Sequence, residues 1–240
     1  LELHYQPKIR FSDGKAVAVE ALMRWPIDGG FIPPVKFIPV AETSGLIFEL
    51  ERFLVKRACT DYLKLAELGH SDINIAINVS ASVLETQAFF SYFKSTIKAH
   101  NVPAENLCIE LTEGTVSRNQ AILVNQLHKY RAIGVKISLD DFGTGYNSLA
   151  QLNSLPIDQI KIDKSFVDNI LTDERALKLN KAIMLIAKTM ALEIVAEGIE
   201  YQEQGNTMNE LGCDQGQGYW YSRPLPLPTL LDWLKTHKLP

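Results

Sequence analysis

Cysteine is scarce in this sequence, and the few that occur do not form a motif. The 240 residues contain three cysteines, Cys59, Cys108 and Cys213, which lie far apart and make no C-x-x-C pair. This spacing argues against a disulfide framework and against a zinc site built on cysteine pairs. It predicts reduced packing residues in a cytoplasmic protein.

Excess positive charge and long hydrophobic runs are also missing. The formal net charge is −4, and lysine and arginine form no dense run. A protein that binds DNA or RNA through phosphates normally carries a basic stripe, so we predict no nucleic-acid polymer as a partner. No apolar run approaches the roughly 20 residues needed to cross a bilayer, and no signal peptide is recognisable. We therefore expect no membrane contact by this domain itself.

The sequence begins at Leu1, without a methionine. We therefore expect a single domain over residues 1–240 that is excised from a larger multidomain protein. Its expected location is cytoplasmic, although segments outside this sequence could anchor the full-length protein to a membrane.

What the sequence does contain is a regular alternation of short apolar runs and amphipathic segments. Apolar runs typical of strands occupy 1–9, 16–23, 73–79, 107–111, 135–139, 160–162 and 193–196, with a weaker eighth near 212–219. Helical spacing is found in 49–68, 82–100, 116–133, 174–192 and 201–211. Such alternation is typical of the α/β class with a mostly parallel sheet.

Eight strand–helix units in this length predict a modified TIM-type (β/α)8 barrel, with an open doubly wound sheet as the alternative. The first two strands are separated only by F-S-D-G-K, a hairpin-length connection. They should therefore pair antiparallel, which a regular barrel would not do.

Polar residues stand at the ends of nearly all these apolar runs. They are Glu20, Asn78, Glu110 with Glu113, Asp140 with Asp141, Lys161 with Asp163, Glu197 with Glu200, and Gln217. In a parallel barrel the carboxyl ends of all strands open onto one face, so we expect these side chains to converge there.

The repulsion among so many neighbouring carboxylates must be compensated by protons or cations. Two carboxylates about 4 Å apart repel by roughly 4 kcal/mol at an effective dielectric constant of 20. Oxygen ligands without histidine or cysteine indicate a hard divalent ion such as Mg²⁺ or Mn²⁺ rather than zinc. The adjacent Asp140 and Asp141 could bridge or divide between two ions, an arrangement that hydrolyses phosphate esters.

Simpler interpretations exist for individual members of this set. A single acid at a strand end is often a helix cap or a solvated loop residue. Glu110 and Glu113 could form an anionic cluster at a helix N-terminus, and Lys161 with Asp163 a surface ion pair. The set as a whole, with nearly one polar residue per strand, favours the functional interpretation.

Eight short motifs occur in order along the chain. They are Y-Q-P-K (5–8), E-A-L-M-R-W (20–25), I-N-V-S (77–80), E-L-T-E (110–113), D-D-F-G-T-G-Y (140–146), K-I-D-K-S-F-V (161–167), A-E-G-I-E (196–200) and G-C-D-Q-G-Q-G-Y (212–219). Over essentially the whole chain they resemble the EAL domain, a bacterial signalling module that acts as a cyclic di-GMP phosphodiesterase. The resemblance implies hydrolysis of cyclic di-GMP to linear pGpG by water attack assisted by two ions, Mg²⁺ or Mn²⁺. It also implies inhibition by Ca²⁺.

The resemblance further implies a role for individual residues. Metal ligands are expected at Glu20, Asn78, Glu110, Asp140, Asp141 and Glu197. Catalytic roles are expected for Glu20, Lys161 and Glu197. Substrate contacts are expected at Gln6, Leu22, Arg24, Asp163, Glu200 and Gln217. As a hypothesis, the pKa of Lys161 falls enough for a share in proton transfer if its amine is held beside the metal ions.

The loop that follows the fifth strand is expected to have a regulatory role. In this family it is thought to couple dimer contacts to metal binding, and we assign Glu113 and Asn147 to it. The family usually has a small Ser or Ala at the position of Asn147, whose amide can hydrogen-bond locally. A homodimer is expected, with an interface from a helix near 147–154 or 174–190.

Two alternatives to hydrolysis remain. One is a catalytically silent EAL domain that binds cyclic di-GMP or a protein partner. The other is an unrelated metal-dependent barrel hydrolase or lyase. Hydrolysis is favoured because all the expected strand-end acids are present.

Overall fold

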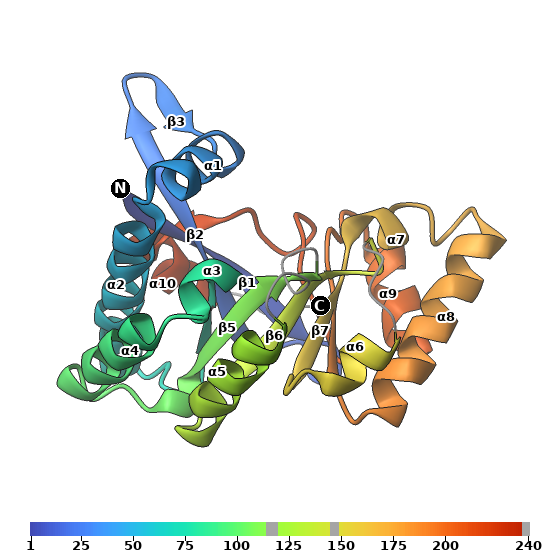
Figure 1. The fold of residues 1–240 in the computed structure, drawn as a ribbon. Coiled ribbons are helices and arrows are strands. Elements are labelled where there is room, and N and C mark those ends of the chain that lie inside the picture. Colours follow the sequence, from blue (N-terminus) through green and yellow to red (C-terminus); the bar gives the residue numbers. More distant parts are fainter. Residues whose placement is uncertain (114–119, 145–148, 237–240) are drawn as a thin grey trace.

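The centre of the protein is a closed barrel of eight strands. The computed structural model describes residues 1–113, 120–144 and 149–236. The barrel strands are β1 (Glu2–Arg10), β2 (Ala16–Ile27), β4 (Asn74–Asn78), β5 (Leu107–Thr112), β6 (Lys136–Phe142), β7 (Gln159–Ile162), β8 (Glu193–Ala196) and β9 (Gln215–Gly216). Figure 1 shows the strands in the interior of the molecule and the helices around them.

The barrel closes through β1, which pairs antiparallel with both β2 and β9. From β2 through β4 to β9, neighbouring strands pair in parallel and in sequence order. The predicted modified barrel with an antiparallel first strand is therefore confirmed, and the open doubly wound sheet is excluded. The reversal follows from the connection at residues 11–15, which is too short for a crossover. There Gly14 has a φ of 68°, a conformation that favours glycine.

The reversed direction of β1 decides which of its residues reach the mouth. In the β1–β2 register Gln6 lies opposite Glu20, and Lys8 lies opposite Ala18. Because side chains alternate along a strand, Gln6 and Lys8 share one face. Lys8 therefore enters the barrel one layer below Gln6.

Helices connect the strands and cover the outside of the barrel. The longer ones are α1 (Pro34–Ser44), α2 (Ile47–Glu67), α4 (Gln87–Ala99), α5 (Gln120–Ala132), α8 (Glu174–Thr189), α9 (Gln202–Leu211) and α10 (Leu227–Thr236). The shorter ones are α3 (Ala81–Leu84), the 3₁₀ helix η1 (Ala104–Asn106), α6 (Leu149–Ser154) and α7 (Lys164–Asp168). The predicted helices at 49–68, 174–192 and 201–211 match α2, α8 and α9 to within a few residues.

The helix predicted over 82–100 is divided into α3 and α4. The division lies at Thr86, whose hydroxyl oxygen accepts a hydrogen bond from the backbone N–H of Phe89 at 3.2 Å. A side chain that caps the next helix in this way stabilises the start of a new helix rather than continuation of the preceding one. Within the described residues, the helix predicted over 116–133 begins at Gln120.

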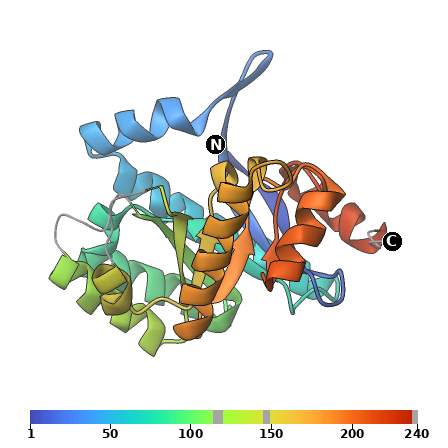
Figure 2. The same ribbon diagram turned by 90° about the vertical axis from the view of Figure 1, so that its right-hand side faces the viewer.

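The second strand is longer than predicted, and the prediction that it ends at Glu20 is wrong. β2 continues to Ile27 because its outer part pairs with β3 (Gly30–Ile32), so Glu20 lies in the middle of the strand. Pro26 fits there because the outer part of β2 is an edge. Figures 1 and 2 both show the β2–β3 hairpin projecting beyond the barrel.

Two of the further elements that were not predicted from the sequence pack against β2 or β1. One is α1, whose stretch contains Pro33, Pro34 and Pro39 and therefore looks like a loop. Pro34 occupies the first turn, where a missing N–H is tolerated. The other is the pairing of β10 (Leu225–Pro226) with β1, which leads the chain into α10.

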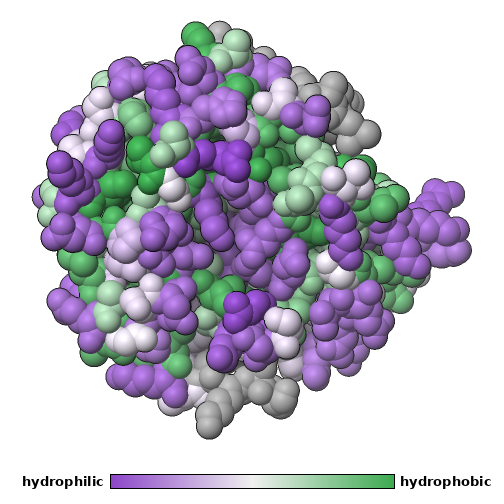
Figure 3. Space-filling model, turned by 90° about the horizontal axis from the view of Figure 1, so that it is seen from below, coloured by the Kyte–Doolittle hydropathy of each residue, from purple (hydrophilic) through white to green (hydrophobic). Residues whose placement is uncertain are grey.

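The barrel strands are buried on both faces, which explains their nearly continuous apolar runs. In β5, residues 107–111 are all buried, with side chains alternating between the barrel interior and the surrounding helices. Seen from below, hydrophilic side chains cover most of the surface, and the hydrophobic ones lie in smaller separate groups (Figure 3). No helix among the described residues has the length and apolar character needed to span a membrane.

All three cysteines are buried and unpaired, in agreement with the packing role predicted for them. Burial raises the pKa of the Cys59 and Cys108 thiols to about 12. These thiols therefore remain protonated at neutral pH.

We predict that Gly218→Ala destabilises the fold by about 2 kcal/mol or more, as measured by urea unfolding. A Cβ at Gly218 would lie 2.1 Å from the backbone oxygen of Ile199, an atom that cannot move without shifting the chain. Gly30→Ala is the matched control, because a Cβ there meets nothing within 4 Å. Equal unfolding free energies for the two variants would contradict the prediction.

Candidate active site and metal centre

The mouth of the barrel brings most of the predicted residues into one cluster around Lys161. The Lys161 Nζ atom lies 2.7 Å from Glu197 Oε1, 2.9 Å from Glu110 Oε2 and 3.0 Å from Asp140 Oδ1. Glu20 Oε2 follows at 3.6 Å. The Lys161 side chain is 1% exposed, so the alternative of a surface ion pair with Asp163 is excluded.

The hypothesis of a lowered Lys161 pKa concerns an amine held beside metal ions, and without ions the surroundings of Lys161 act in the opposite direction. Burial alone would lower this pKa, but the surrounding carboxylates, with Asp140 and Glu110 foremost, raise the pKa well above the usual value of lysine. Opposite charges within about 4 to 6 Å favour the charged form of a group. Lys161 is therefore a fixed ammonium ion in this structure.

Glu20 is held by two amide side chains. Asn78 Nδ2 donates to Glu20 Oε1 at 2.7 Å, and Gln217 Nε2 donates to Glu20 Oε2 at 2.7 Å. Burial opposes ionisation of Glu20, but Lys161 and Lys8 together with these two donors lower its pKa to about 2. Glu20 is therefore a carboxylate at neutral pH.

Glu110 is fully buried between two ammonium groups. Its Oε2 accepts from Lys161, and its Oε1 accepts from Lys8. Lys8 is 1% exposed and was not predicted as a site residue. Burial lowers the pKa of Lys8, but the Glu110 carboxylate outweighs burial and raises it. The available signal was a lysine within the apolar run of the first strand, two residues after Gln6.

The carboxylates form two groups that share Asp140. Oxygen atoms of Glu20, Glu110 and Asp140 lie within 4.8 Å of one another, and so do oxygen atoms of Asp140, Asp141 and Glu197. All donors are oxygen atoms, the type that Mg²⁺ and Mn²⁺ prefer. The buried Gln217 Oε1 has no hydrogen-bond partner among the described residues. The residues therefore fit divalent ions and their water.

The backbone at Asp141 adopts an unusual conformation that separates the two neighbouring aspartates. Asp141 has a φ of 56°, which is uncommon for a residue other than glycine. Its N–H donates to Asp140 Oδ1 at 2.9 Å. Burial, followed by the Asp140 charge, raises the pKa of Asp141. Left-handed backbone of this kind at a cluster of charges is a mark of a functional constraint.

Glu113 contacts the start of the loop that follows β6. Its Oε2 accepts from the backbone N–H of Gly143 at 2.9 Å, so it links the end of β5 to that loop. The regulatory role assigned to Glu113 from the sequence stays a prediction. Asn147, the other residue assigned to the loop, lies outside the described residues.

Four of the six expected substrate-binding residues line one cavity of about 300 Å³ next to Glu20 and Glu197. They are Gln6, Leu22, Glu200 and Gln217. The other two expected residues, Arg24 and Asp163, are not part of the lining of this cavity. Arg24 Nη1 donates to the Met23 carbonyl oxygen at 2.9 Å. Asp163 Oδ1 caps α7 by accepting from the backbone N–H of Ser165 at 3.0 Å.

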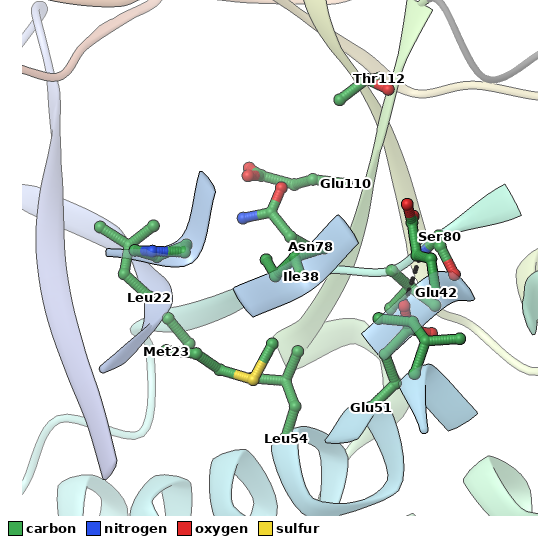
Figure 4. A pocket seen from close by; sticks show the side chains of 14 residues that line it. Leu22, Met23, Ile38, Glu42, Glu51, Leu54, Asn78, Ser80, Glu110 and Thr112 are labelled. Carbon is green, nitrogen blue, oxygen red and sulfur yellow. Dashed lines mark hydrogen bonds between the residues drawn. The ribbon is translucent and has the colours of Figure 1, made fainter. Parts of the chain in front are cut away.

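A second cavity of about 300 Å³ lies on the other side of Leu22, between β2, β4 and the helices α1 and α2. Its lining is largely apolar, with Leu22, Ile38 and Leu54 among it, and it also contains carboxyl groups (Figure 4). Sequence reasoning missed this cavity because it depends on α1. Leu22 lines both cavities and stands between them.

Glu51 is a buried carboxyl group of the second cavity. Its Oε1 accepts from the backbone N–H of Ser80 at 2.8 Å, as Figure 4 shows, and its Oε2 has no partner among the described residues. Burial raises the pKa of Glu51 to about 8. At neutral pH this group is therefore mainly a neutral acid with a hydrogen-bond donor.

Comparison with known proteins agrees with this geometry. The EAL domain family model matches residues 1–224. The chain is 38% identical to the cyclic di-GMP phosphodiesterase NbdA of Pseudomonas aeruginosa, over 99% of this chain and 30% of that protein. It is 37% identical to the bifunctional diguanylate cyclase/cyclic di-GMP phosphodiesterase MucR of the same organism, over 96% of this chain and 34% of that protein.

A solved structure of the PaMucR phosphodiesterase in complex with c-di-GMP superimposes with a TM-score of 0.89 at 37% identity. The match covers 95% of this chain and 93% of that one. The chain spans about a third of the length of the two curated relatives, which are therefore larger proteins.

We predict that Glu51→Gln flattens the pH dependence of stability. The unfolded chain releases the Glu51 proton near pH 4.5 and the folded protein near pH 8, so the wild type loses stability as the pH rises between these values. The loss attributable to Glu51 is up to about 1.4 kcal/mol per pH unit. Urea unfolding at pH 5.5 and 7.5 measures it, and parallel profiles for the two proteins would refute the assignment.

Proposed function

The chain belongs to the EAL domain family, and on this basis we propose that it hydrolyses cyclic di-GMP to linear pGpG with two divalent metal ions. The observation that carries the proposal is the position of Asp140, which belongs to both carboxylate groups of the barrel mouth. A shared carboxylate is the arrangement expected for two ions about 3.5 to 4 Å apart. The named activities of NbdA and MucR support the same reaction.

In this proposal the acids divide between the two ions. Glu20, Asn78, Glu110 and Asp140 hold one, while Asp140, Asp141 and Glu197 hold the other. Bound Mg²⁺ or Mn²⁺ would lower the pKa of water and neutralise charge that develops on the phosphate. Asn78 and Gln217 fix the orientation of Glu20 through the two hydrogen bonds described above.

Glu197 and Lys161 have complementary roles beside these ligands. Glu197 is proposed either as a ligand of the second ion or as the acceptor of the proton of the attacking water, and without ions burial raises its pKa to about 8. Lys161 keeps its proton and meets a phosphate oxygen or the attacking water through a hydrogen bond. The motifs contain no histidine, and their one cysteine, Cys213, is buried with a thiol pKa raised by burial, in keeping with direct attack by water.

The two cavities suit a ligand with two bases. Because Leu22 separates them, a cyclic dinucleotide can place one base on each side and its phosphates at the carboxylate cluster. Guanine presents two N–H donors on one edge, for which the carboxylates of Glu42 and Glu200 in the respective cavities are acceptors. Arg24 is proposed to bind a phosphate through its planar fork. Asp163 is proposed to contact the substrate from the start of α7.

Several wider properties belong to the same proposal. We expect a homodimer in the cytoplasm, a domain of a larger signalling protein, and no nucleic-acid polymer as partner. Ca²⁺ is expected to inhibit, because it prefers longer bonds and more ligands than Mg²⁺ and would distort the site. Glu113 and Asn147 are proposed to act on the loop after β6.

The competing proposal is a silent receptor that binds cyclic di-GMP without cleaving it. Completeness of the carboxylate set argues against it, because binding alone does not need two groups of metal ligands. The two proposals differ in one measurable outcome, the formation of pGpG.

We predict that the protein converts cyclic di-GMP to pGpG in Mg²⁺, and that Glu20→Gln lowers kcat by at least about 100-fold because it removes a ligand charge. Chromatography of the products measures both, and added Ca²⁺ should suppress turnover. Glu174→Gln is the control, because that side chain is 79% exposed. Binding without turnover in the wild type would favour the receptor, and undiminished turnover in Glu20→Gln would refute the site.

We predict that a single turnover in ¹⁸O-labelled water places one label on the new terminal phosphate of pGpG. Direct attack by water transfers the solvent oxygen to phosphorus in the step that breaks the ester bond. Mass spectrometry of the product measures the label. An unlabelled single-turnover product would instead indicate attack by an enzyme carboxylate on phosphorus, followed by attack of water on the carboxyl carbon of the resulting acyl phosphate.

A further inference from the structure

Lys8 is a buried charge for which neither the sequence motifs nor the proposed reaction provides a role. It lies on β1, which runs antiparallel to its neighbours, and its side chain is 1% exposed. The small Ala18 opposite it in the register leaves room for the lysine stem. A fully buried lysine is rare unless it is paired. In this chain its ion-pair partner is Glu110.

The two oxygens of Glu110 are used by two different lysines. Oε2 faces the shared centre, where Lys161 Nζ also contacts Asp140 and Glu197. Oε1 accepts from Lys8, for which the ion pairs of the described residues show no second carboxylate. Each oxygen of the Glu110 carboxylate therefore has its own ammonium partner.

The position of Lys8 affects the balance of charge among the acids of the barrel mouth. The five acids of the two groups carry five negative charges, which two divalent ions and the Lys161 ammonium would balance. Without ions, Lys161 and Lys8 are the positive charges beside these acids: Lys161 pairs with acids of both groups, whereas Lys8 pairs with Glu110 and also acts on Glu20. Removing one partner of a buried ion pair is strongly destabilising, because it leaves buried charge uncompensated.

We propose that Lys8 is a positioning residue of the metal centre: it reserves Glu110 Oε1, so that Glu110 meets a metal ion through Oε2 alone, and it balances part of the acid charge when the ions are absent. The proposal rests on the metal dependence put forward under the proposed function. One-oxygen ligation leaves more coordination positions for water and substrate than two-oxygen ligation. The same contact stabilises Glu110 in the metal-free protein.

The test compares thermal unfolding of wild type and Lys8→Met in EDTA and in saturating Mg²⁺. In EDTA the variant should lose roughly 6 °C or more in Tm, because Glu110 loses a counter-ion. In Mg²⁺ the loss should shrink by at least about half, because the ion replaces the missing charge and ligand binding stabilises the folded state. An equal loss in both conditions would show that Lys8 serves packing alone, and would overturn the proposal.

Tyr5→Phe is the matched control on the same strand. It removes a buried hydrogen bond from Tyr5 to Asp61 Oδ2 of 2.8 Å, outside the carboxylate cluster. Its Tm loss should therefore be the same in EDTA and in Mg²⁺. If the Lys8 variant does not fold, Lys8→Gln takes its place, because glutamine keeps a donor for Glu110 but removes the charge.

A second measurement, the Mg²⁺ concentration for half-maximal stabilisation, distinguishes the role of Lys8 from that of the metal ligands. Removing a positive charge beside the site should lower the Mg²⁺ concentration for half-maximal stabilisation several-fold in Lys8→Met. Removing a ligand charge in Glu110→Gln should raise it. An increased requirement in Lys8→Met would refute the proposed charge balance. If the Tm of the wild type does not respond to Mg²⁺ or Mn²⁺, the proposed metal site fails, and the proposal for Lys8 fails with it.

Discussion

The ammonium group of Lys161 in the middle of four carboxylates is the interaction on which the barrel mouth depends. The acids come from different strands, β2, β5 and β6 and the turn after β8, and they would repel one another without a cation among them. Lys161 supplies that cation from β7, and Lys8 adds a second from β1. The protein can therefore keep its acids close together in a metal-free state, with the lysine charges standing in for ions.

The barrel topology decides which atoms meet at this point. Parallel strands bring Glu20, Glu110 and Asp140 to one level, while the antiparallel β1 inserts Gln6 beside Glu20 and Lys8 beneath it. The extension of β2 and the helix α1 then add a second cavity beside Leu22. A regular barrel, with all strands parallel, would present neither Lys8 nor this cavity in the same place.

Much of this arrangement is predictable from the sequence, because apolar runs buried on both faces and polar residues at their ends leave a clear pattern. The eight strands, the antiparallel start and the convergence of Glu20, Glu110, Asp140 and Glu197 follow from it. The helix α1 was not predicted because its prolines are typical of a loop. The strand β2 was predicted too short because its outer part depends on pairing with β3. The raised pKa of Lys161 in the metal-free arrangement was not predicted, because its direction depends on distances to four carboxylates, which spacing along the chain does not supply.

The burial of the cysteines has a consequence for how the domain responds to oxidants. Peroxides react with thiolates, and burial raises the pKa of Cys59 and Cys108 to about 12, so very little thiolate exists at neutral pH. Cys108 is two residues from Glu110, yet it is as inert as an apolar side chain of the same size. Peroxide should therefore leave the Cys59 and Cys108 thiols unmodified, so a response of this domain to oxidants would not begin at either residue.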